Sequence, residues 1–193
     1  MQWDLPKYVE LDGINEDNEI CRVNYKIRND CDYRIVLDVI SALNDTELDE
    51  QNRLSCALFI FYEDLSGCQD IETAAKEMLK IINGGEEPDK KEEEEPKIMD
   101  WEHDFSNIAA PISRVLGYSV RDKKNYTHWY DFIGAYGEIG DCYWAQVINI
   151  RLKRKQGKPL DENERRFYRE HRKDIYLPIK LSKDDEEWIN ESW

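Results

Sequence analysis

Three histidines and five cysteines are the side chains of this 193-residue chain best suited to bind a metal or to act as nucleophiles. His103, His128 and His171 fall in three different expected helices or at their starts, without the spacing of a metal site. The cysteines are Cys21, Cys31, Cys56, Cys68 and Cys142. They are widely spaced, are odd in number and include no Cys-x-x-Cys pair, so we interpret them as free, buried thiols in a reducing compartment. We therefore predict no metal site.

No common catalytic or nucleotide-binding motif is present. The chain lacks GxxxxGK[ST], GxGxxG, HExxH and GxSxG. His103 lies between Glu102 and Asp104, but adjacent residues of a helix point in different directions. In a chain with 42 acidic residues, pairs of carboxylates suited to acid–base catalysis arise by chance. These observations predict a protein that is not an enzyme and has no catalytic residue, metal or cofactor.

The charge is strongly acidic overall and locally basic. A net charge of −15 argues against general binding to nucleic acid or to an anionic membrane. There is no apolar run long enough to span a bilayer and no signal peptide at the N-terminus, so we expect a cytoplasmic protein. Residues 151–173, however, contain ten Lys or Arg and four acids, a net charge of +6. This stripe predicts contact with an acidic protein surface, either in the chain's own N-terminal half or in a partner.

The residues that must be positioned around any site are concentrated between Tyr126 and Ile150, the densest aromatic stretch of the chain. Helical spacing places Trp129, Phe132, Ile133 and Tyr136 on one stripe, and Trp144, Val147, Ile148 and Leu152 on a second. Gly137 and Gly140 between them indicate a helix end and a turn. The pattern predicts two antiparallel helices. Their aromatic faces form either the core of a small helical domain or part of a groove for a partner.

The N-terminal part combines strand and helix patterns. Tyr8 to Asn29 predicts a small β-hairpin or β-meander, with a turn signal at Asp12-Gly13 and loop residues around Asn15 to Asn18. Three helices follow, and they are expected to bury the following apolar stripes: Val36, Val39, Ile40 and Leu43; Leu54, Leu58, Phe61, Tyr62 and Leu65; Ile71, Ala74, Ala75, Met78, Leu79 and Ile82. Asp30 or Asp32 can cap the first helix.

A stretch without apolar residues, Gly84 to Pro96, separates this part from the rest. Its glycines, prolines and acids predict a solvated linker. We therefore predict a mainly α protein with a small N-terminal β-hairpin (α+β), divided into residues 1–84 (hairpin and three helices), 85–98 (flexible acidic linker), 99–181 (helical domain) and 182–193 (acidic tail).

The second helical domain carries one helix breaker and one strong cap. Pro111 lies among helically spaced apolar residues, so either the helix bends there or a new helix begins at the proline. Asp161 and Glu164 form a capping pair ahead of a charged helix expected over residues 163–174.

The order of these segments over nearly the whole chain resembles a family of tail assembly chaperones from tailed phages and prophages of Gram-positive bacteria. Their genes lie between those of the major tail protein and the tape-measure protein. The resemblance is most specific at Asp100-Trp101-Glu102 with Asp104, at His128-Trp129-Tyr130-Asp131-Phe132, and at Ile148-Asn149-Ile150-Arg151 leading into a Lys/Arg-rich helix. Family members often have an unbroken helix where this chain has Pro111.

This resemblance implies a non-enzymatic protein that binds the tape-measure protein, keeps it soluble and helps to recruit tail-tube subunits. The tail-tube protein and a second copy of the chain are further candidate partners. The location implied is the host cytoplasm and not the mature virion. As contact residues we select Trp129, Tyr130 and Tyr136, with Arg151, Arg154 and Lys155 as a charged rim.

Three other functions stay open. A structural tail or head-completion component would be found in purified particles. A host-directed acidic factor, such as a nucleic-acid mimic, would bind a host DNA-binding protein. A metal-dependent enzyme would purify with stoichiometric metal.

Overall fold

The computed structural model describes residues 5–15, 17–87 and 98–178. It is mainly helical with a two-stranded antiparallel hairpin at its start, which confirms the predicted fold class. Contacts divide the described residues into an N-terminal unit, which contains residues up to 87 together with 126–132, and a C-terminal unit, which contains 98–125 and 133–178. Most of the expected linker and the whole acidic tail lie outside the described residues, so the domain boundaries stay a prediction.

The hairpin consists of β1 (Tyr8–Ile14) and β2 (Ile20–Lys26), paired from Tyr8 opposite Lys26 to Ile14 opposite Ile20. The expected turn at Asp12-Gly13 is wrong, because Gly13 lies within β1 opposite Cys21. A Cβ atom at this position would lie 2.4 Å from the Tyr25 hydroxyl and 2.9 Å from the Val23 side chain. Glycine is therefore needed here because these side chains pack closely against the backbone. Asn15 makes the turn instead, since its side chain accepts hydrogen bonds from the N–H groups of Asp17 and Glu19.

Three capped helices complete the N-terminal unit. A short 3₁₀ segment, η1 (Arg28–Cys31), precedes α1 (Tyr33–Leu43), α2 (Glu50–Phe61) and α3 (Ile71–Ile82). Each α-helix begins after an aspartate whose side chain accepts a backbone N–H of the first turn: Asp32, Asp49 and Asp70. Of the two caps expected for the first helix, Asp32 is therefore the one used.

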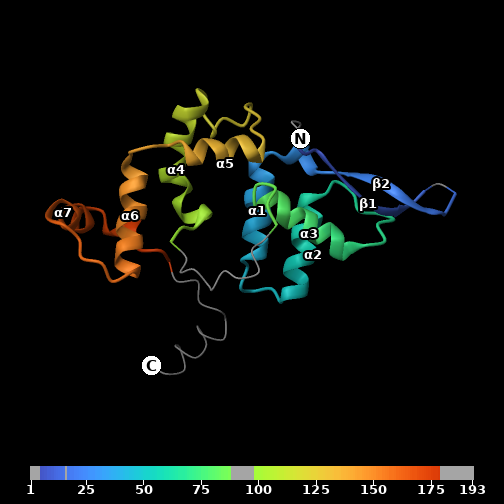
Figure 1. Ribbon diagram of the computed structural model, residues 1–193, viewed down its shortest axis with the longest axis horizontal. Coiled ribbons are helices and arrows are strands. Elements are labelled where there is room, and N and C mark those ends of the chain that lie inside the picture. Colours follow the sequence, from blue (N-terminus) through green and yellow to red (C-terminus); the bar gives the residue numbers. More distant parts are fainter. Residues whose placement is uncertain (1–4, 16, 88–97, 179–193) are drawn as a thin grey trace, which may run out of the picture. The chain divides into compact units, whose positions relative to one another are not determined.

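The core of this unit lies between the inner face of the hairpin and the three helices (Figure 1). Its fully buried apolar side chains include Leu11, Ile27, Val36, Val39, Phe61 and Met78. Tyr62 is also buried, and its hydroxyl donates to the Ala74 carbonyl at 2.9 Å, which joins the end of α2 to α3. The stripes expected from helical spacing thus supply part of this core, whereas Ile71 of the third stripe is 46% exposed.

The C-terminal unit begins with α4 (Trp101–Leu116), one helix that runs through Pro111 and ends at Gly117, whose φ is 78°. A new helix therefore does not begin at the proline. The expected helix pair is present as α5 (Trp129–Gly137) and α6 (Tyr143–Lys155). The buried stripe of α6 differs from the expected one, because Leu152 is exposed and the buried side chains are Trp144, Val147, Ile150 and Arg151.

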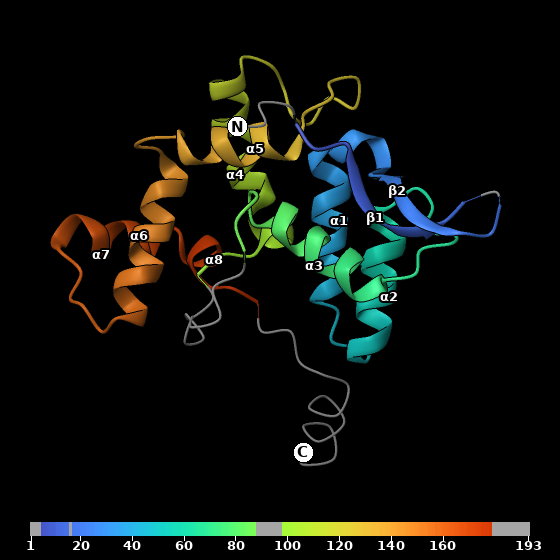
Figure 2. The same cartoon turned by 45° about the vertical axis from the view of Figure 1, so that its right-hand side comes forward.

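Two short helices close the described chain. The helix expected over residues 163–174 is divided at His171 into α7 (Glu162–Glu170) and α8 (Arg172–Ile175). The capping box of Asp161 and Glu164 at the start of α7 is confirmed. Figure 2 shows α6, α7 and α8 as neighbours, with α8 beside α6. In the described ranges, no helix combines the length and the apolar character needed to cross a membrane.

Candidate functional site

The aromatic motif between Tyr126 and Phe132 binds into the N-terminal unit. The Tyr126 hydroxyl donates to the Asp30 carbonyl at 2.6 Å, and the Thr127 N–H donates to the Asp32 side chain at 3.3 Å. In return, the Tyr33 N–H donates to the Thr127 carbonyl at 2.9 Å. A segment that is distant in sequence therefore completes the region at the start of α1.

His128 is fully buried in this segment, and both of its ring nitrogens are used. Its Nε2 donates to the Pro6 carbonyl at 3.1 Å, and its Nδ1 accepts the Tyr130 N–H at 3.0 Å. Because a carbonyl can only accept and a backbone N–H can only donate, the imidazole must be neutral and protonated at Nε2. Burial lowers the pKa of His128 below its ordinary value, which favours the same neutral form.

The three aromatic residues selected as contacts lie inside their own units. Trp129 is 2% exposed and donates from Nε1 to the Ile82 carbonyl at 2.9 Å, so its side chain packs in the core of the N-terminal unit. Tyr130 is half-buried, and burial raises its pKa. The half-buried Tyr136 donates to the Met99 sulfur at 3.2 Å and accepts from Trp144 Nε1 at 3.3 Å. A contact role for these two tyrosines stays a prediction.

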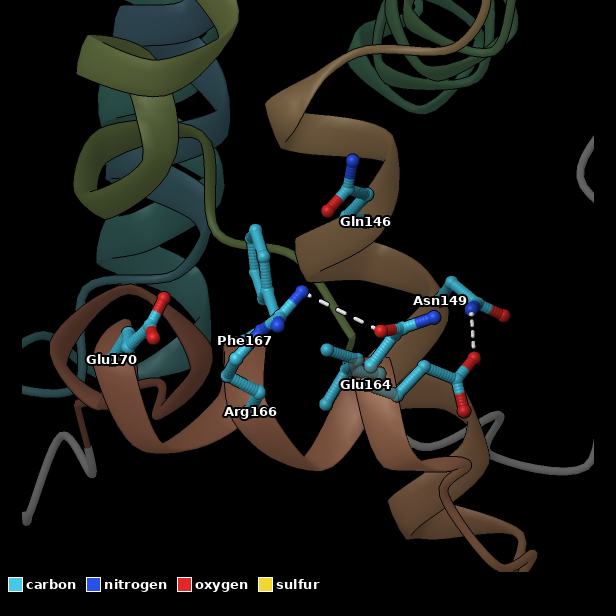
Figure 3. A pocket seen from close by; sticks show the side chains of 8 residues that line it. Gln146, Asn149, Glu164, Arg166, Phe167 and Glu170 are labelled. Carbon is cyan, nitrogen blue, oxygen red and sulfur yellow. Dashed lines mark hydrogen bonds between the residues drawn. The ribbon is translucent and has the colours of Figure 1, made fainter.

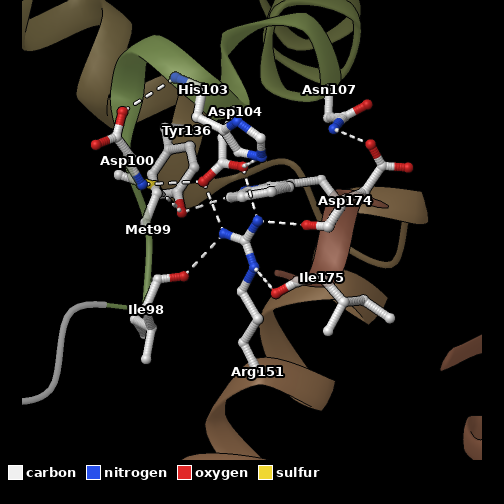
Figure 4. Close-up of polar contacts among 11 residues, drawn as sticks. Ile98, Met99, Asp100, His103, Asp104, Asn107, Tyr136, Arg151, Asp174 and Ile175 are labelled. Carbon is white, nitrogen blue, oxygen red and sulfur yellow. Dashed lines mark hydrogen bonds and ion pairs between the residues drawn. The ribbon is translucent and has the colours of Figure 1, made fainter. Parts of the chain in front are cut away.

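Arg151, expected on a charged rim, is instead buried at the centre of a polar network (Figure 4). Its Nη1 and Nη2 donate to the two carboxylate oxygens of Asp104 at 2.7 and 2.8 Å. Nη1 also donates to the Ile98 carbonyl at 3.0 Å, and Nε donates to the Ile175 carbonyl at 3.0 Å. Nη2 makes a further contact with the Asp174 carbonyl. The guanidinium thus joins α4, α6, α8 and the segment before α4.

The position of Arg151 in the helix carries the signal for this role. Arg151 follows Trp144 and Val147 at i+7 and i+4, on the stripe that a helix buries. An arginine on such a stripe requires a carboxylate, and Asp104 on α4 supplies it. The number of basic residues in this segment led to the prediction that Arg151 faces solvent, because that count takes no account of its position on the helix.

Arg154 and Lys155 are exposed, as expected of a rim. The Arg154 guanidinium lies 4.6 Å from the ring centre of Tyr168 and 4.7 Å from that of Tyr176. Arg172 approaches the Tyr168 ring at 5.5 Å, and the two tyrosine hydroxyls hydrogen-bond to each other. We refer to Arg154, Tyr168, Arg172 and Tyr176 as the arginine–tyrosine cluster. The hydrogen bond with Tyr168 and the neighbouring Arg154 lower the pKa of Tyr176.

A pocket of about 390 Å³ lies between α6 and α7 (Figure 3). Its lining is mostly polar: Gln146, Asn149, Ile150, Asn163, Glu164, Arg166, Phe167 and Glu170. Glu164 is already engaged by Asn149 at 2.9 Å and by Lys153. The pocket therefore offers amides, one ring and the charged side chains of Arg166 and Glu170, and its lining includes no Ser, Thr, Cys, His or Lys.

The metal-binding and thiol residues are dispersed. Within the described residues, no group of three or more His, Cys, Asp or Glu side chains could hold a metal ion. All five cysteines are free. Cys31 is buried, and burial raises its pKa to about 12. Cys56 is exposed, so the expectation that all five thiols are buried is wrong for this residue.

Large apolar side chains are exposed on the N-terminal unit. Phe59 on α2 is 77% exposed, and Ile20 at the start of β2 is 72% exposed. Ile20 lies directly opposite the partly exposed Ile14. Since Ile14 is 38% exposed and its partner is 72% exposed, this isoleucine pair at the end of the hairpin faces solvent. The apolar stripe expected for α2 did not include Phe59, which agrees with its exposure, but the sequence alone did not single out Phe59 or Ile20 as an exposed apolar surface.

Comparison with known proteins finds one family. The family model described as Bacteriophage Gp15 protein matches residues 12–177, which include both units. No curated protein matches the chain. No solved structure matches it either.

Proposed function

The chain belongs to the bacteriophage Gp15 protein family, and from this premise we propose that it is a tail assembly chaperone. It binds the tape-measure protein of a tailed phage that infects a Gram-positive host, keeps that protein soluble and helps to recruit tail-tube subunits. Its role is binding and not catalysis. It acts in the host cytoplasm and does not remain in the mature virion.

The observation that carries this proposal is the exposure of large apolar side chains on the N-terminal unit. Phe59, Ile20 and Ile14 offer apolar area to solvent on a helix and at the end of a hairpin. A long, amphipathic, helical client exposes apolar stripes before tail-tube subunits cover it. Side chains such as these bind an amphipathic helix along its apolar face.

The charge of the same unit supports this function. Residues 1–90 contain 21 acidic and nine basic residues. A client covered by such a protein acquires negative charge, and mutual repulsion between the resulting complexes opposes aggregation. Apolar contacts and a solubilising charge therefore occur in one unit.

The test is co-expression with the tape-measure protein encoded beside it, followed by affinity purification and light scattering. The wild-type chain should bring the tape-measure protein into the soluble fraction and co-purify with it. The double variant Phe59→Ser/Ile20→Ser should keep its fold and lose this effect. Val115→Ser, which alters an exposed apolar residue of the C-terminal unit, should behave as wild type.

Two outcomes would contradict the proposal. If the tape-measure protein stays insoluble when it is co-expressed with the wild-type chain, the chain is not its chaperone. Recovery of the chain in stoichiometric amounts from purified particles would make it a structural component of the virion.

A further inference from the structure

The ten cations of residues 151–173 have unequal surroundings. Arg151 is buried against Asp104, and Lys153 binds Glu164. Those two cations are therefore used within the fold. The other cations of the stripe are exposed, namely Arg154, Lys155, Lys158, Arg165, Arg166, Arg169, Arg172 and Lys173. The exposed part of the stripe is thus the part that a partner can reach.

The acids of the stripe do not neutralise the arginine–tyrosine cluster. Asp161 and Glu164 are occupied by the capping box at the start of α7, and Glu164 also binds Lys153. In the part of the chain that the structure describes, neither Arg154 nor Arg172 forms an ion pair with a carboxylate. Among the described residues, their positive charge is exposed and has no carboxylate partner.

Aromatic rings hold these two arginines. Arg154 lies against both Tyr168 and Tyr176, and Arg172 lies against Tyr168. Tyr176 is itself 50% exposed. A guanidinium on the face of a ring is restrained in position, while the N–H groups at its edge still point away from the ring. The restraint lowers the entropy that an incoming ligand must remove when it binds.

We propose that the arginine–tyrosine cluster is a docking surface for an acidic segment of a partner protein. Carboxylates of the segment accept paired hydrogen bonds from Arg154 and Arg172, and the exposed ring of Tyr176 covers its aliphatic carbons. This surface is distinct from Phe59 and the hairpin isoleucines, so it serves a second partner and does not depend on the proposed chaperone function.

The charge of the whole chain favours a protein segment over nucleic acid. A nucleic acid carries a regular row of phosphates along its length and would encounter the net charge of −15 beyond this surface. An acidic segment of a protein needs to place only a few carboxylates at the cluster. Nucleic-acid binding is therefore the alternative that the experiment has to distinguish.

The experiment measures fluorescence anisotropy with the full-length chain and two labelled probes. One probe is a short peptide of alternating glutamate and alanine, and the other is an oligothymidylate of equal charge. The peptide should bind, with an affinity that falls as salt is added. Arg154→Ala/Arg172→Ala should weaken peptide binding by about tenfold or more, since each arginine contributes a charge-assisted contact.

The matched control is Lys123→Ala/Lys124→Ala, which removes the same number of exposed charges from a loop of the same unit. It should leave peptide affinity unchanged. The circular dichroism spectra of both variants should match the spectrum of the wild type. A third variant, Arg154→Lys/Arg172→Lys, keeps the charge but removes the paired hydrogen-bond geometry of the guanidinium groups. The proposal is overturned if the peptide does not bind, if the oligothymidylate binds more tightly, or if the control weakens binding as much as the cluster variant.

Discussion

Arg151 and Asp104 form a buried, bidentate ion pair, in which each carboxylate oxygen accepts a hydrogen bond from one guanidinium nitrogen. The side chains are 3% and 0% exposed. The pair joins α6 to α4, and the remaining arginine N–H groups bind backbone carbonyls of Ile98, Asp174 and Ile175. One side chain therefore supports four segments of the C-terminal unit. The network stabilises the unit, and it places the Arg151 guanidinium inside the fold and not on an exposed rim.

Replacement of Arg151 by Met should strongly destabilise the C-terminal unit. It leaves the Asp104 carboxylate buried without a counter-ion, and loss of one partner of a buried pair costs about 3–5 kcal/mol. Urea denaturation followed by circular dichroism measures this loss. Arg169→Met on the exposed face of α7 is the matched control and should change the free energy of unfolding by less than about 0.5 kcal/mol.

The double variant Arg151→Met/Asp104→Leu tests whether the unpaired Asp104 charge causes the loss of stability. If the uncompensated charge dominates, removing the aspartate as well should restore part of the lost stability. If the double variant loses at least as much as both single variants together, the electrostatic explanation is wrong and packing of the arginine is the main contribution.

Acidification should weaken the N-terminal unit through His128. Its pKa is lowered in the folded state, so the unfolded chain binds a proton more readily. The neutral imidazole contributes to the free energy of unfolding. This contribution is fully present above the ordinary pKa of histidine, and it is lost as the pH falls through the lowered pKa of the folded state. The charged groups around the ring are Asp131, Lys7 and Asp30. Free energies of unfolding measured between about pH 7.5 and pH 5.5 should decrease toward the lower pH.

His128→Gln should flatten this pH dependence, because glutamine does not titrate. His171→Gln, on the C-terminal unit, provides the comparison and should keep the wild-type slope. An unchanged slope in His128→Gln would assign the effect to carboxylates instead.

Two glycines should respond to alanine in opposite directions. Gly13→Ala introduces a Cβ 2.4 Å from the Tyr25 hydroxyl, and overpacking of this kind costs about 1–3 kcal/mol. Gly134 is a helical residue of α5 with no atom near its added Cβ, so alanine should stabilise by about 0.5–1 kcal/mol. Thermal denaturation of both variants measures the two changes in stability. A destabilising Gly134→Ala would show that this position requires glycine.

The cysteines should differ in reactivity with a thiol reagent. Cys56 is exposed and should be labelled first. Cys31 is buried with its pKa raised to about 12, so its thiolate is scarce at about pH 8 and it should be labelled last. Peptide mass mapping at successive times measures the order. Early labelling of Cys31 in the native protein would contradict its burial.

Local patterns alone predicted the hairpin and most of the helices of this fold. Capping aspartates indicated the helices that begin after Asp32 and Asp161, because a helix cap depends on a few neighbouring residues. The helix that begins after Asp70 was indicated by its apolar stripe. The pattern around Gly13 was misread, because a glycine indicates a turn and a close approach equally well. Only the pairing of the strands distinguishes the two.

Tertiary structure decided which side chains are available to a partner. The sequence determined that residues 126–132 are aromatic and that residues 151–173 are basic. It could not assign Trp129 to the core, Arg151 to an internal ion pair or Arg154 to an exposed cluster, because each assignment depends on a residue far away in the chain. Ile82, Asp104 and Tyr176 supply those contacts. Charge and periodicity are local properties, whereas burial and pairing arise only when distant segments meet.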